Sequence, residues 1–110
     1  MITSDNTKNI KNLLATYAFS NDFDNLKLLI SENDNIDLNE LIAWNSETES
    51  VVEESEIKEN YDINSPFYYT TLLNLASIKG NVKIVGLLLE YGALPTIRDS
   101  RGRYNILLYL

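Results

Sequence analysis

One stretch of this chain decides its fold: residues 71–93 read TLLNLASIKGNVKIVGLLLEYGA. Apolar residues recur there at the three- and four-residue spacing of a helix face, first over 72–76 and again over 82–89. Gly80 separates the two runs and Gly92 follows the second, which predicts a tight turn and a left-handed helix stop. The stretch is therefore expected to form two short antiparallel helices. Such a pair cannot bury its apolar face alone, so it needs similar neighbours along the chain.

The length and composition of the chain limit what it can be. Its 110 residues suffice for one small domain, and they include neither Cys nor His. This excludes disulfides, thiol nucleophiles, histidine acid–base catalysis and His/Cys zinc sites. The sequence shows no apolar run of membrane-spanning length and no secretory signal pattern at its start. We expect a cytoplasmic protein or one delivered into a host cell, two possibilities that the sequence leaves open.

Charge is unevenly distributed along the chain. Residues 32–62 contain eleven acids against Lys58 alone, which gives this third a net charge of −10. Residues 1–31 are balanced and residues 63–110 carry +3, so the whole chain has a net charge of −7. All three arginines lie within residues 98–103. Such an acidic chain is not expected to bind nucleic acid directly or to associate with an anionic membrane.

The pattern at 71–93 resembles the ankyrin repeat, a helix pair plus a hairpin loop of about 33 residues. Thr71 falls where that family places a helix-capping Thr. Leu72 replaces the usual Pro, which costs a pre-set first helical turn. Asn74 replaces the usual His, and its amide can still form a hydrogen bond to a neighbouring loop. The resemblance implies a stack of such units.

The flanking sequence supplies candidate neighbours. Residues 17–30 align with 76–89, with Asn21 in the place of Gly80, a position that Asn tolerates because it can adopt positive φ. Asn33 stands where the second helix stop would be, and the preceding helix is expected to begin near Ser4 or Asp5. Downstream, 99–103 is similar to the family's Asp-x-x-Gly-x loop, and a further repeat then starts and stops at Leu110.

The middle of the chain, residues 38–64, is the least regular part. Apolar residues from Leu38 to Trp44 predict one short helix, and Val51 to Ile57, amid glutamates, predict a second. These would form a degenerate, acidic repeat with Trp44 buried. The alternative is an acidic loop inserted between two intact repeats.

Together these patterns predict a single domain over residues 1–110. Its fold class is all-α: an ankyrin-repeat solenoid of about three helix-turn-helix repeats plus a terminal half-repeat. The expected repeats are 4–37, 38–64, 65–97 and, in part, 98–110.

No catalytic constellation is visible in the sequence. The acids at 53, 54 and 56 lie too close together to oppose each other across a substrate, and they are typical of a solvated helix face. The chain also lacks a calcium-loop spacing, and Gly80 and Gly102 are each explained by turn geometry rather than by phosphate binding. We therefore expect no enzymatic activity, no catalytic or metal-ligating residues and no cofactor.

The resemblance implies a protein-binding module, monomeric on its own, that uses loop tips and a concave helix surface. Aromatic residues and Arg dominate binding hot spots, and Arg grips carboxylates in a bidentate manner. The residues expected to contact a partner protein are Phe67, Tyr68, Tyr69, Arg98, Arg101 and Arg103, with Glu53, Glu54 and Glu56 as a second patch.

Alternatives remain open at both patches. The arginines could instead balance the protein's own acidic middle or keep the loop soluble. The acidic third could be an ordinary solvated surface, engage a basic protein, or imitate the charge of nucleic acid. The alternative function is a stoichiometric inhibitor, an immunity or anti-defence protein that blocks a basic toxin, a nuclease or a nucleic-acid-binding complex.

Overall fold

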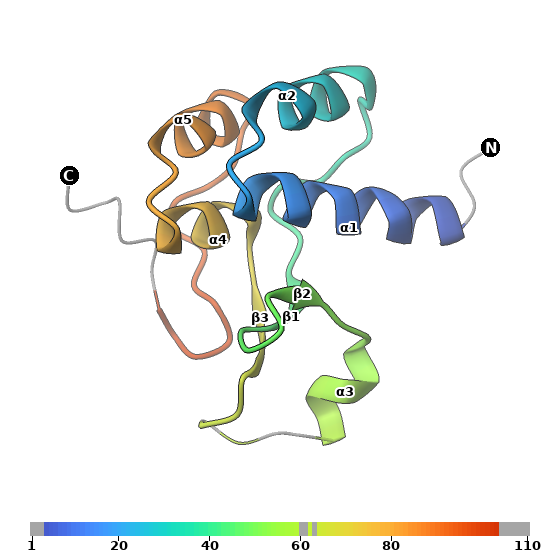
Figure 1. Ribbon diagram of the computed structural model, residues 1–110, viewed down its shortest axis with the longest axis vertical. Coiled ribbons are helices and arrows are strands. Elements are labelled where there is room, and N and C mark those ends of the chain that lie inside the picture. Colours follow the sequence, from blue (N-terminus) through green and yellow to red (C-terminus); the bar gives the residue numbers. More distant parts are fainter. Residues whose placement is uncertain (1–3, 60–61, 63, 104–110) are drawn as a thin grey trace.

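The computed structural model describes residues 4–59, 62 and 64–103, and this part of the chain contains five helices and three strands (Figure 1). In chain order the elements are α1 (Ser4–Phe19), α2 (Phe23–Glu32), β1 (Ile42–Asn45), β2 (Ser50–Val51), α3 (Glu54–Glu59), β3 (Phe67–Thr70), α4 (Leu72–Ile78) and α5 (Val82–Glu90). The predicted all-α class is wrong in one respect, because a small sheet accompanies the helices. The half-repeat expected at the end falls largely on 104–110, outside the described residues.

Two helix pairs stack directly on each other. α1 packs on α4 and α2 packs on α5, so that α2 and α5 form one layer, α1 and α4 the next, and the strands lie below (Figure 1). Ala15 and Ala18 of α1 and Ala76 of α4 are completely buried. Their small side chains let the two helices approach closely. Two of the predicted helix pairs therefore exist, and each buries its apolar face against the other.

The turns within the two helix pairs share one backbone conformation. Asn21 has φ 63° and Gly80 has φ 71°, as their alignment predicts. Gly92 also has positive φ, which confirms the predicted helix stop, whereas Asn33 is extended at φ −129° and its side-chain amide donates to Leu29 O at 2.7 Å. Alignment thus predicts the tight turns correctly but not the end of α2.

Two asparagine side chains join the stacked pairs through backbone groups. Asn81, in the second turn, donates from Nδ2 to Ala18 O at 3.0 Å, so it satisfies a carbonyl at the end of α1 that has no partner within the helix. Asn39, after α2, accepts from Leu94 N at 2.8 Å and donates to Gly92 O at 3.2 Å. These contacts hold one helix pair against the other, one at the end of α1 and one at the chain that follows α5.

The sheet has strand order β2-β1-β3 and is antiparallel throughout, with Trp44 opposite Tyr68. The helix expected from Leu38 to Trp44 is therefore wrong, because β1 occupies its second half. All four residues of β1 are buried, and Trp44 packs its ring against Phe19 of α1 at a centroid distance of 5.1 Å. A strand buried on both faces shows no alternation, so its pattern cannot be separated from that of a buried helix.

Residues 42–59 form a compact insertion between the two helix pairs. Of the two helices expected in the middle of the chain, only α3 is present among the described residues, and it packs against β3 with Ile57 buried. This arrangement differs from a helix-turn-helix unit, and it also differs from a simple loop because it contains two strands and a helix. Across the described residues, no helix is both long enough and apolar enough to cross a bilayer.

The two glycines of the second helix pair should respond to alanine with opposite signs. Gly80→Ala should lower the free energy of unfolding by about 1 kcal/mol, because a side chain at positive φ is strained although no atom lies within 4 Å of its Cβ. Gly86→Ala should raise it by about 1 kcal/mol, because Gly86 is exposed inside α5 with equally open space. Urea unfolding of both variants checks this, and two changes of the same sign would contradict the turn geometry.

Candidate functional site

The three consecutive aromatic residues lie on strand β3 and not in a loop as expected. Tyr68 is buried, whereas Phe67 and Tyr69 are half-buried on the alternate face. One edge of β3 pairs with β1. On the other edge Ser100 N donates to Tyr69 O and Tyr69 N donates to Ser100 Oγ, both at 2.9 Å. The aromatics are thus fixed in a sheet whose next neighbour is the arginine-containing segment.

That segment, residues 98–103, is called the arginine loop below. Its conformation is fixed by Asp99, which is 5% exposed. One carboxylate oxygen accepts from the backbone N–H groups of Arg101 and Arg103, at 2.9 Å each, and the other accepts from Arg103 Nε at 2.7 Å. Gly102 takes positive φ within this turn. The loop is therefore ordered before any partner arrives.

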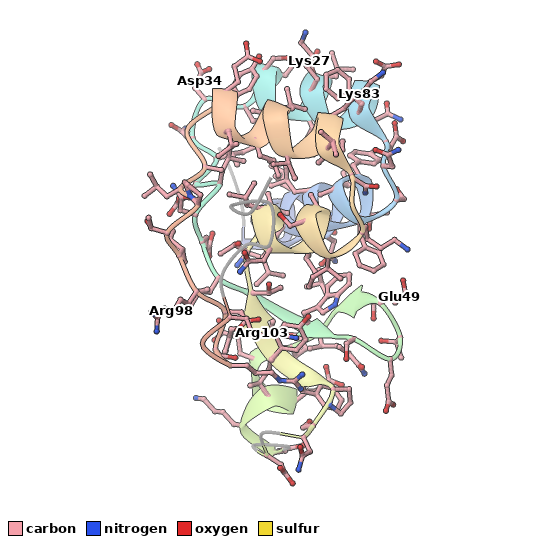
Figure 2. The ribbon with its side chains drawn as sticks, turned by 90° about the vertical axis from the view of Figure 1, so that its left-hand side faces the viewer. Lys27, Asp34, Glu49, Lys83, Arg98 and Arg103 are labelled. Carbon is pink, nitrogen blue, oxygen red and sulfur yellow. The ribbon has the colours of Figure 1, made fainter. Side chains whose placement is uncertain are left out.

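Two of the three arginines stack on the buried tyrosine. The guanidinium carbons of Arg101 and Arg103 lie 4.5 and 4.8 Å from the centroid of the Tyr68 ring, within the range of a cation–π interaction. Arg103 still exposes 49% of its side chain. Arg98 is exposed and extends outward from the loop (Figure 2). The expected arginine patch thus has an internal role for Arg101 and Arg103, and Tyr68 offers little surface of its own.

The second expected patch lies on α3 and just before it. Glu53 N donates to a carboxylate oxygen of Glu56 at 2.9 Å, which caps the start of the helix. Glu53 and Glu54 are exposed and Glu56 is half-buried. The helix lies on one side of β3 and the arginine loop on the other (Figure 1). The fold therefore does not combine the two expected patches into one surface.

The remaining eight acids of 32–62 form further exposed surface that the expected site omitted. They are Glu32, Asp34, Asp37, Glu40, Glu47, Glu49, Glu59 and Asp62. Glu47 and Glu49 belong to the β1–β2 turn, and Figure 2 shows Glu49 on the opposite side of the molecule from Arg98. Their position depends on a hairpin that was not expected, although the density of acids in the sequence already indicated an electronegative surface.

This surface has the charge to attract cationic partners. Among the described residues, no three acidic side chains are grouped closely enough to hold a metal. Spread over a turn, a loop and a helix, the carboxylates instead form a broad negative field.

Removing the carboxylate of Asp99 should unfold the arginine loop and destabilise the domain. Asp99→Ala eliminates three hydrogen bonds to a buried charge, so we expect the free energy of unfolding to fall by about 2 to 3 kcal/mol. Ser100→Ala removes only the Oγ contact to Tyr69 N and should cost about 1 kcal/mol or less. Urea unfolding provides the measurement. Equal effects of the two substitutions would show that Asp99 does not organise the loop.

Comparison with known proteins bears on the second helix pair. No curated protein and no solved structure matches the chain. Residues 68–100 match the family model described as Ankyrin repeat, a range that covers β3, α4, α5 and the start of the arginine loop. Of these elements, α4 and α5 are the helix pair that the sequence resemblance implied. Over residues 68–100 the chain is therefore similar to an ankyrin repeat, which supports an ankyrin-repeat protein.

Proposed function

We propose that this chain is a non-enzymatic protein-binding module that engages a basic partner protein through its acidic segment, residues 32–62. Ankyrin repeats generally mediate protein–protein interactions, which supports the class of function. The observation that carries the proposal is the net charge of −10 in this segment, where ten of the eleven carboxylates are exposed. Such a field accelerates the approach of a positively charged protein and disfavours nucleic acid and anionic membranes.

The arginine loop and β3 provide a second, smaller contact surface in this proposal. Arg98 and part of Arg103 are accessible, and Phe67 and Tyr69 are half-buried beside them. Because Asp99 and Tyr68 already order the loop, a partner would bind it at little cost in conformational entropy. The acidic segment would then govern the rate of association and the arginine loop would add local contacts.

A narrower candidate is a stoichiometric inhibitor of a basic toxin, a nuclease or a nucleic-acid-binding complex. The number of exposed carboxylates supports it: they lie on the loop after α2, on the β1–β2 turn and on α3. A high density of negative charge on a small protein can compete for a surface that otherwise binds phosphates. This candidate would form a saturable complex with one partner, whereas a general adaptor would bind several.

The proposal is tested by affinity capture from a lysate of the source organism with matched charge variants. Glu47→Lys/Glu54→Lys reverses two exposed charges in the acidic segment. Asp24→Lys/Glu90→Lys makes the same change in net charge on exposed residues of α2 and α5. We expect the first variant to lose about tenfold or more in affinity for the captured partner and the second to lose much less, because close charges act most strongly.

Salt dependence provides an independent measurement on the same partner. Capture by the native chain should weaken steeply between low and high ionic strength. Arg98→Glu should also weaken capture of the partner, because it removes a contact that the arginine loop is proposed to make. A partner that is retained at high salt and bound equally by both charge variants would contradict the acidic-segment proposal.

A further inference from the structure

A cavity of about 280 Å³ lies between α1 and the chain that leads from α2 to β1. Its inner wall is apolar, since Leu14, Ile42 and Leu72 are buried and Ile10 and Ile36 are half-buried. Its outer wall is polar and exposed. The acidic residues that line it are Glu32, Asp34, Asp37 and Glu40. The cavity thus combines an aliphatic interior with a negatively charged mouth.

The charges at the mouth are only partly neutralised. Lys11 lines the cavity, and its Nζ pairs with Glu40 at 2.7 Å. Among the described residues, no cation forms an ion pair with Glu32, Asp34 or Asp37, although Asp37 accepts a hydrogen bond from Asn39 N at 2.9 Å. Three carboxylates of the lining therefore have no ion-pair partner among the described residues and lie beside apolar side chains.

We propose that this cavity receives a lysine or arginine side chain of the partner protein. The aliphatic stem would lie against Ile10, Ile36 and Ile42, and the cationic head would remain at the mouth near Glu32 and Asp34. Long basic side chains bury their methylene groups in this way while the charge stays hydrated. The inference rests on the proposed function, because it names the contact through which a basic partner would be held.

The size and charge of the cavity favour this occupant. A cavity of about 280 Å³ lies at the lower end of the roughly 300–1,000 Å³ range of drug-sized ligand pockets, which is enough room for a single long side chain. A carboxylate or phosphate would meet three negative charges, and the lysine that could attract it is already paired with Glu40. A neutral alkyl group would fill the apolar interior but would form no electrostatic interaction with the carboxylates at the mouth.

Small probes of matched shape test the cavity without a known partner. The ¹⁵N-labelled full chain is titrated with n-butylammonium, n-butylguanidinium, 1-butanol and butyrate, and backbone amide shifts are recorded by NMR. We expect the two cations to shift the amides of Ile10, Asn35 and Ile36 with at least tenfold higher affinity than butanol, and butyrate to have no effect. From ethyl- to butylammonium the affinity should rise about fourfold per added methylene, as burial of the stem requires.

Matched variants separate the cavity from general electrostatic attraction. Glu32→Gln/Asp34→Asn should reduce the affinity for butylammonium about tenfold or more. Glu47→Gln/Glu49→Gln makes the same change in net charge on the β1–β2 turn and should leave that affinity almost unchanged. The same NMR spectra show whether each variant is folded.

The inference is overturned if butanol binds as well as butylammonium, if no cation shifts the lining amides, or if both double variants lose affinity equally. These outcomes are distinct from failure of the proposed function. Salt-sensitive capture of a partner would stand even if the cavity bound no cation. Probe binding to the cavity would likewise stand if no basic partner were captured.

Discussion

The close packing of α1 against α4 is the contact on which the rest of the structure depends. Neither helix pair has enough apolar surface of its own to form a core. Ala15, Ala18 and Ala76 are completely buried in the core that the two pairs share, so a larger side chain at any of these positions would disturb the packing of α1 on α4. The alignment of α2 with α5 and the position of β3 below α4 both follow from this contact.

Polar side chains fix how the two pairs are aligned. Asn81 and Asn39 bind backbone groups of the opposite pair, which an apolar interface alone would allow to slide. Apolar packing is non-directional, whereas a hydrogen bond to a particular carbonyl specifies a register. The high Asn content of the chain carries no such information by itself, because only the fold distinguishes these two residues from the others.

Local sequence signals predicted the helix pairs, whereas the sheet and the packing of the arginine loop depend on contacts between residues far apart in the chain. Gly80, Asn21 and Thr71 act within a few residues of themselves, and Thr71 Oγ1 accepts from Asn74 N at 3.1 Å as the capping position predicts. The strand at Ile42–Asn45 exists because residues 67–70 pair with it, a contact that periodicity cannot reveal. The cation–π contacts on Tyr68 likewise join positions more than thirty residues apart, so the clustering of arginines predicted an exposed patch and missed its internal partner.

The insertion at 42–59 has a consequence for how the folding of the molecule can be observed. Trp44 is the only tryptophan of the chain, and it lies at the junction between the sheet and α1. Its fluorescence therefore reports whether the sheet is docked on the helices, while far-ultraviolet circular dichroism reports the helices themselves. The two signals follow different parts of one small domain, and the molecule carries both without any label.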